Sequence, residues 1–417
     1  MTPDQIFSQA YNYQVACMFK RAIDLYKEII SDSDDSTTQY LVHRNLGLCY
    51  RSTREFDKSI YHFNKAIALK RYRSHPWAQM AETYYYSGDY FQGHKFLEWK
   101  YDDLTQEKRL DWDDPYVRYA VLTRGTGTNP DIVFPSDDEL VEIYANILSK
   151  VKGKIINVRS TQGLDDVVYA SYFIKELLRY EPAKIILSAR LEVLRLFYDL
   201  DEKIIVQDKI PTPDEYDYFV PSTVLPKLML DTSSVKKPWL KPRSLDIAFA
   251  RSIINNTVKT LGHSDGLDGL VGLVGVVWRT ENKNPTDYLR SFTLDDFLYA
   301  LNVTKDARAQ LGSDNVMLSL QFDAKPDEVE LLKQHNIVNL GTYIHDLYAM
   351  SSFMQALDHV ITTDTVSAHV AGTSGTPCTI LTPRCMGDFR WGRTDDTKVY
   401  DGLNIVEFNK KLSFCEI

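Results

Sequence analysis

Short apolar runs alternate with amphipathic segments from about residue 154 onward. Apolar, β-branched runs of about 4–8 residues are typical of buried strands, and their alternation with helical patterns predicts parallel sheets covered by helices. Strands of a first series are predicted at residues 155–158, 184–188, 203–206 and 218–220, with a helix at 166–179. Strands of a second series are predicted at residues 270–278, 316–322, 337–340, 358–362, 378–381 and 405–408, with helices at 294–301, 327–334 and 347–357. We therefore expect two doubly wound domains, bridged within residues 221–243, that bind ligands at the carboxyl ends of their strands.

The first hundred residues carry a different pattern, an internal repeat. When Ala10, Gly47 and Ala81 are aligned, an aromatic residue recurs three and nine positions later, and a small residue recurs twelve positions later. The three units are offset by 37 and then 34 residues. Small residues at fixed positions let paired helices approach closely, and this spacing resembles tetratricopeptide repeats. Such an array implies binding of a protein or peptide, oligomerisation, or bracing of the neighbouring domain.

Residues 101–135 separate these two parts and are acidic, then rich in Gly, Thr, Asn and Pro, which predicts a domain junction. Asp111 and Asp113 superficially match the Asp-x-Asp that holds a metal in one fold of sugar transferases. No strand-like run precedes them, so we expect a solvated linker there.

The bulk composition excludes several classes of protein. A net charge of −9 disfavours broad electrostatic contact with nucleic acid. The five cysteines include no pair at zinc-site spacing, so we expect reduced thiols. No apolar run approaches the roughly 20 residues that span a bilayer, and the N-terminus lacks a signal-peptide pattern. The expected location is the cytoplasm, with no transmembrane segment.

The most informative stretch for chemistry runs through residues 357–391. Its predicted strand ends in small polar residues that include Asp364 and Thr365, and a helix is predicted to begin at Ser367. A helix N-terminus offers unpaired N–H groups and a positive dipole end to a phosphate. Asp364, Thr365, Ser367, His369 and Gly372 are therefore candidate nucleotide-binding residues. For His369 the alternative is a histidine hydrogen-bonded within the helix packing.

A second cluster follows the first strand of the α/β part. Gln162 and Gly163 form a predicted glycine turn, which lets the backbone pass close to a ligand. Asp165 and Asp166 come directly afterwards, at the start of a helix that faces the expected ligand cleft. The alternative for either carboxylate is simple capping of that helix.

A third cluster follows the strand at residues 270–278. Arg279, Lys283, Arg290 and Ser291 would place cationic and hydroxyl donors near one strand end, where a diphosphate could sit. Taken singly, each cation suits a solvated loop equally well. The chain contains no Gly-x-Ser-x-Gly, Walker loop or Gly-x-Gly-x-x-Gly, which argues against hydrolase, phosphate-loop ATPase and dinucleotide-binding functions.

The order and spacing of these clusters resemble the heptosyltransferase-type glycosyltransferases of the GT-B fold, particularly members with N-terminal tetratricopeptide repeats. The resemblance covers roughly residues 151–408. The matching pieces in the N-terminal half are Gln162-Gly163-Leu164-x-Asp166 and Asp217-Tyr218 before Leu225-Pro226. The matching pieces in the C-terminal half are Gly275-Val276-Val277-Trp278, Arg290-Ser291, Asp364-Thr365-x-x-x-His369-x-Ala371-Gly372, Gly375-x-Pro377, Asp388-Phe389-Arg390-Trp391 and Tyr400.

The resemblance implies that the C-terminal domain holds a nucleotide-sugar donor, that transfer inverts the anomeric carbon, and that neither a metal nor a further cofactor takes part. Asp166 is similar in position to the family's general base. Arg279, Lys283 and the helix N-terminus near Thr365 would stabilise the departing diphosphate. Asp165 stands where the family usually has glycine, so the two aspartates could exchange roles. Arg279-Thr280 replaces the family's usual small residues, which could alter donor choice.

The predicted fold class is α + α/β, a tetratricopeptide array followed by a GT-B pair of Rossmann-like domains. We expect the repeats at residues 1–104, a junction with a helix at 105–150, the acceptor-side domain at 151–243, and the nucleotide-sugar-binding domain at 244–417. Alternatives to a transferase are a non-catalytic scaffold that senses a nucleotide and a nucleotide-sugar epimerase. The acceptor could also be macromolecular, such as a protein, a glycan or a modified DNA base.

Overall fold

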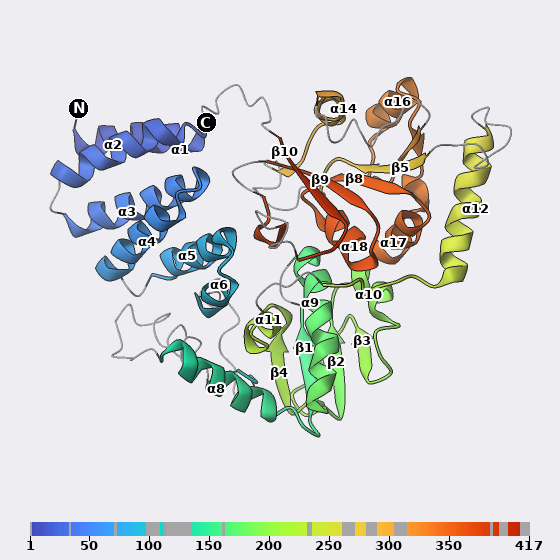
Figure 1. Ribbon diagram of the computed structural model, residues 1–417, viewed down its shortest axis with the longest axis horizontal. Coiled ribbons are helices and arrows are strands. Elements are labelled where there is room, and N and C mark those ends of the chain that lie inside the picture. Colours follow the sequence, from blue (N-terminus) through green and yellow to red (C-terminus); the bar gives the residue numbers. More distant parts are fainter. Residues whose placement is uncertain are drawn as a thin grey trace.

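The computed structural model describes residues 2–32, 35–70, 73–96, 109–111, 113, 135–160, 163–231, 236–260, 272–280, 290–303, 315–383, 387–391 and 399–408. A helical array lies at one side of the molecule, and two α/β units make up the rest (Figure 1). Within these ranges, no helix is both long and apolar enough to cross a membrane.

The array consists of consecutive helix pairs. The pairs are α1 (Pro3–Val15) with α2 (Phe19–Asp32), α3 (Ser36–Ser52) with α4 (Phe56–Leu69), and α5 (Ser74–Ser87) with α6 (Tyr90–Phe96). The repeated small positions are where helices meet: a Cβ atom added at Gly47 would lie 2.6 Å from the Phe63 ring, and one at Gly93 would lie 2.5 Å from the Tyr85 ring. The periodicity therefore reports real close packing, and assignment to the tetratricopeptide class stays a prediction.

The junction contains one departure from the sequence-based expectation. Arg109 and Asp111 form a fully buried ion pair, with Nε to Oδ1 at 2.6 Å, and Leu110 donates its N–H to the carbonyl of Phe219. The prediction of a solvated linker was wrong at these residues, because Arg109 supplies the partner that allows the carboxylate to leave water. A helix, α8 (Asp137–Ser149), follows and begins with a capping box between Ser136 and Glu139.

The first α/β unit is built on a parallel sheet. Its described strands lie in the order β3 (Ile204–Gln207), β2 (Lys184–Ser188), β1 (Ile155–Arg159) and β4 (Tyr218–Pro221). Its helical elements are α9 (Leu164–Glu176), η2 (Leu177–Tyr180), α10 (Leu191–Phe197), η3 (Ser222–Val224) and α11 (Leu225–Leu228). The buried faces of these strands are rich in Ile, Leu and Val, as a sheet covered by helices requires.

The second unit has a longer parallel sheet. Its described strands lie in the order β10 (Leu403–Phe408), β9 (Cys378–Pro383), β8 (His359–Thr363), β5 (Gly272–Val277), β6 (Asn315–Ser319) and β7 (Val338–Asn339). Its helical elements are α12 (Ser244–Thr260), α14 (Leu294–Val303), α16 (Pro326–Gln334), η4 (Gly341–Tyr343), α17 (Leu347–Gln355), α18 (Val366–Ser374) and η5 (Phe389–Trp391). Strand order reverses on either side of β5, which is the doubly wound arrangement of Rossmann-like domains.

These observations confirm the predicted fold class, a helical array followed by a pair of Rossmann-like domains. Each predicted strand coincides with an observed one to within a few residues. The two units meet where α9 packs against α18 and α10 against α17 (Figure 1). Because α9 follows β1 and α18 follows β8, the carboxyl ends of strands from both sheets converge at this junction.

Candidate active site

A cavity of about 160 Å³ lies at this junction. Its walls come from segments that directly follow strands of both sheets. They include Gly163–Asp165 after β1, Arg190 after β2, Val277, Arg279 and Thr280 at the end of β5, Gln321 and Phe322 after β6, and Thr365–Ser367 after β8. Doubly wound sheets place ligands at this edge, so the cavity is the candidate active site.

The two aspartates of the glycine turn lie differently. The Asp165 side chain lines the cavity. Asp166 caps the first turn of α9, because its Oδ2 accepts the Gly163 N–H at 3.3 Å, and it is not among the lining residues. The sequence-based alternative for these residues, helix capping, therefore describes Asp166, while Asp165 has the position from which a carboxylate reaches a ligand.

Arg390, on η5, connects the two domains through their carboxylates. Its guanidinium lies 2.5 Å from Asp388, 3.3 Å from Asp165 and 3.2 Å from Asp166. The Arg390 side chain is only 4% exposed, so it is a buried cation held by three carboxylates. Burial alone would raise the pKa of Asp165, but the Arg390 guanidinium beside it outweighs burial and holds that pKa below its usual range. Asp165 is therefore ionised at neutral pH.

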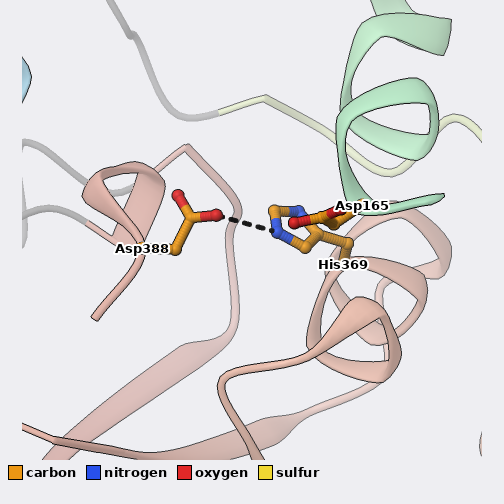
Figure 2. Close-up of side chains that lie close together, drawn as sticks. All are labelled: Asp165, His369 and Asp388. Carbon is orange, nitrogen blue, oxygen red and sulfur yellow. Dashed lines mark ion pairs between the residues drawn. The ribbon is translucent and has the colours of Figure 1, made fainter. Parts of the chain in front are cut away.

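His369 lies between this network and Tyr400. Its Nδ1 is 2.8 Å from the Tyr400 hydroxyl, and its Nε2 is 3.6 Å from Asp388 Oδ2. Figure 2 shows His369 from α18 next to Asp388 and to Asp165, which comes from the other domain. Burial, and then the Arg390 charge, lower the pKa of His369, which favours a neutral imidazole. The expectation of a histidine hydrogen-bonded in the packing fits this geometry.

Asp364 anchors the segment that carries Arg390. Its two oxygens accept the Trp391 indole N–H at 2.9 Å and the Asp388 backbone N–H at 2.7 Å. Burial, and then the Asp388 charge, raise the pKa of Asp364 to about 7. Asp388 behaves oppositely: burial would raise its pKa, but Arg390 and His369 hold it well below the usual range. Two neighbouring carboxyls thus have pKa values pushed far apart, a pattern common at functional sites.

The start of α18 also lines the cavity. Thr365 is the N-cap and its side chain caps no backbone N–H; its hydroxyl lies 2.5 Å from that of Ser367. The N–H groups of the first helical turn, beside Thr365 and Ser367, therefore face the cavity with a positive dipole end. Gly372 is not a lining residue; a Cβ there would lie 2.5 Å from the Tyr400 ring, so this glycine permits close packing.

The candidate residues that follow β5 have different environments in the structure. Arg290 lines the cavity, with Nη1 at 3.8 Å from Asp165 Oδ2. Arg279 also lines it, but its guanidinium is bound to Asp323 at 2.5 Å and Glu328 at 3.0 Å. Ser291 accepts the Thr280 N–H at 3.2 Å and lines a separate cavity of about 680 Å³ beside α14 and α16. Arg290 is thus better placed than Arg279 to meet a phosphate.

Two candidate residues, Gln162 and Lys283, lie outside the described residues, and so do Cys385 and Cys415. Sequence reasoning missed three others near the site, Arg190, Gln321 and His345, and it quoted Arg390 in a motif without assigning it a role. Arg190 and Gln321 each come within two residues of a strand's carboxyl end, the same signal that selected Asp165, and could have been found that way. Two partners of Arg390, Asp165 and Asp166, lie more than 200 residues away, so no local pattern reveals its role in joining the two domains.

The cluster of Asp165, His369 and Asp388 has the dimensions of a metal site, since one ligand atom from each lies within 4.8 Å of the others. Arg390 already contacts two of these three side chains. A divalent ion between the same carboxylates would stand next to a buried guanidinium, so the donor set fits a guanidinium better than a metal.

Comparison with known proteins finds weak similarity to solved structures. No protein-family model matches the sequence, and no curated protein sequence is found as a relative. Solved structures that resemble it include a glycosyl transferase family 9 protein from Veillonella parvula, with 14% identity, a TM-score of 0.40, and coverage of 62% of this chain and 87% of that one. The ADP-heptose heptosyltransferase II of E. coli has 13% identity, a TM-score of 0.39, and coverage of 60% and 89%.

A third similar structure is the O-GlcNAc transferase of Thermobaculum terrenum, with 10% identity, a TM-score of 0.25, and coverage of 93% of this chain and 83% of that one. These similarities are too weak to carry an argument about activity. The fold class rests on the architecture described above.

Proposed function

We propose that this protein is a glycosyltransferase that moves a sugar from a nucleotide-sugar donor to an acceptor hydroxyl. One observation carries the proposal: a cavity between two Rossmann-like domains is lined by both an ionised carboxylate, Asp165, and the N-terminus of α18. A base and an anion site in one cavity suit group transfer from a diphosphate. The quoted sequence motifs, which resemble heptosyltransferase-type enzymes, support the same chemistry.

In this mechanism the acceptor hydroxyl lies against Asp165, which takes its proton as the oxygen attacks the anomeric carbon. The attack comes from the face opposite the leaving diphosphate, so the anomeric carbon is inverted. The first-turn N–H groups of α18, together with Arg290, meet the negative charge that grows on the leaving group. We propose Asp165 as the base because it lines the cavity, and Asp166 is the alternative that the family resemblance favours. The proposed mechanism uses no metal, as the family resemblance implies, and the buried guanidinium of Arg390 among the carboxylates supports this.

For the acceptor, the proposal extends only to its general class. The helical array beside the site suits a macromolecular acceptor, such as a protein or glycan, better than a small one. The acidic net charge of −9 speaks mildly against DNA.

The test begins with binding and turnover. Thermal shifts with nucleoside mono- and diphosphates identify the base of the donor, because a ligand at about 100 times its Kd adds about 2.7 kcal/mol. Release of nucleoside diphosphate from the matching nucleotide-sugar then measures turnover, and the recovered sugar is checked for epimerisation. Flat melting curves with every nucleotide would instead favour a non-catalytic scaffold, and an epimerised donor without transfer would favour an epimerase.

Two matched variants test the base. Asp165→Asn should lower kcat by roughly 10²- to 10⁴-fold, the usual contribution of a general base, with nucleoside diphosphate affinity nearly unchanged. Asp166→Asn should keep most of the activity, because Asp166 caps α9 and does not line the cavity. If Asp166→Asn alone abolishes turnover, the base is Asp166.

A further inference from the structure

The helical array touches the segment that organises the active site. The Tyr85 ring of α5 stacks on the Phe389 ring with centroids 4.1 Å apart and planes 16° apart. The neighbouring Tyr86 hydroxyl donates to the Gly387 carbonyl. Phe389 packs into a small apolar cluster formed by Tyr85 and Tyr90, both from the array. One face of residues 387–391 therefore rests on α5 and α6.

The other face of the same five residues belongs to the active site. Arg390 holds Asp165 and Asp166 of the first domain. Trp391 and the Asp388 N–H hold Asp364. The ring that meets the array and the guanidinium that meets the base belong to consecutive residues, Phe389 and Arg390. A displacement of Phe389 is therefore transmitted to Arg390 through a single peptide unit.

The Tyr85 contact is itself braced from within the array. The Tyr85 hydroxyl lies 2.7 Å from Nδ1 of the buried His94, and the ring fills the space left by Gly93. Tyr85 is 1% exposed, so its ring has little room to move independently of α5 and α6. The array thus presents a rigid aromatic surface to Phe389.

We propose that the helical array is a positioning element of the active site, with Tyr85 and Phe389 as the positioning residues that set where Arg390 holds Asp165. This inference rests on the proposed function for its catalytic consequence. A partner that binds the array and shifts α5 would change turnover more than donor affinity. The array would then serve as a regulatory input and not only as a holder for an acceptor.

The experiment compares full-length variants. Tyr85→Ala and Phe389→Ala remove the stacked pair from either side, and Tyr85→Phe restores the ring without the hydroxyl. Tyr86→Phe is a milder change that removes only the hydrogen bond to Gly387. Tyr26→Ala is the matched control, because Tyr26 is a fully buried aromatic of the array that belongs to the cluster formed by α1, α2 and α3.

The first measurement needs no substrate. Hydrogen exchange should be faster at the Asp388 amide and in the first turn of α9 in Tyr85→Ala and Phe389→Ala, with wild-type rates in Tyr85→Phe and an intermediate effect in Tyr86→Phe. The control Tyr26→Ala should lower the melting temperature and leave these amides as in wild type. Unchanged exchange at these amides in both alanine variants would overturn the proposal.

The second measurement uses turnover of the donor. Tyr85→Ala and Phe389→Ala should lower kcat by about 10- to 100-fold, the effect of a misplacement on the order of 1 Å, with donor KM within about threefold. The acidic limb of the pH profile should move to higher pH, because Asp165 would be less held by Arg390, while Arg290, His369 and Asp388 still face it. Wild-type kcat and an unshifted profile would also overturn the proposal. If the wild-type protein turns over no donor, the proposed function is wrong. The exchange rates would still decide whether the array positions residues 387–391.

Discussion

Replacement of Arg390 by methionine is the sharpest test of how the site is assembled. The guanidinium is 4% exposed and is shared by Asp388, Asp165 and Asp166. Methionine fills a similar volume and leaves these carboxylates buried without their cation. Removal of one partner from a buried ion pair typically destabilises a fold by about 3–5 kcal/mol. For a domain of this size, that corresponds to a fall in melting temperature of roughly 6–20 °C.

The pH dependence of this loss identifies its cause. In the wild type the pKa of Asp388 lies well below its usual range, so its contribution to stability is present above the usual carboxylate pKa and is lost as pH falls through the lowered value. In Arg390→Met the guanidinium is gone and burial raises the pKa of Asp388 instead. The variant then binds protons on folding, and its deficit relative to wild type should shrink as pH falls from 8 towards about 5.

Scanning calorimetry at several pH values measures both effects. Arg243→Met is the matched control, because Arg243 pairs with Asp199 at the surface, where both side chains are more than half exposed, and its loss should leave the melting temperature unchanged. Asp388→Asn in the Arg390→Met background should recover part of the loss. A fall of less than about 1 °C in Arg390→Met, or a deficit independent of pH, would refute the reasoning.

Three further predictions concern neighbouring groups. Burial raises the pKa of Asp364 to about 7, so the contribution of Asp364 to wild-type stability should fall as pH rises from about 4 to 7. The free energy of unfolding of Asp364→Asn, relative to wild type, should therefore increase by up to about 4 kcal/mol over this range. Urea titrations measure this difference, and a difference independent of pH would contradict the prediction. Arg290→Ala should weaken nucleoside diphosphate binding by about 1.5–3 kcal/mol, roughly 10- to 150-fold. Arg279→Ala should weaken it by less, because Asp323 and Glu328 hold the Arg279 guanidinium. Calorimetric titration measures both affinities, and equal losses would show that Arg279 also binds the phosphate. A chelator should leave turnover unchanged, and inhibition reversed by Mn²⁺ or Mg²⁺ would show that a metal takes part.

Local pattern predicted most of the fold. A strand such as β5 is a continuous apolar run, which a parallel sheet covered on both faces requires, so composition alone locates it. The repeat also emerged from sequence, because the close approach at Gly47 and Gly93 tolerates no larger side chain. Segments that end strands, such as the one at Asp165, could be assigned to the ligand edge by topology alone.

Contacts between distant parts of the chain were beyond local pattern. The sequence predicts that Asp111 lies in a solvated linker, whereas in the structure it is buried beside Arg109 and β4. The sequence predicts that Arg279 binds a phosphate, whereas in the structure Asp323 and Glu328, more than 40 residues later, neutralise its charge. In each case the sequence identified a charge and the tertiary structure identified its partner.

The sequence by itself thus determined the helical array, the two α/β domains, and the strand ends where chemistry gathers. The tertiary structure decided which charges face the cavity and which face one another. It placed Asp165 at the cavity and Asp166 in a helix cap, and it brought Arg390 from the far end of the chain to both. The physical reason is that secondary structure follows from the local periodicity of apolar residues, whereas the state of a charge depends on its burial and its nearest opposite charges, which folding alone brings together.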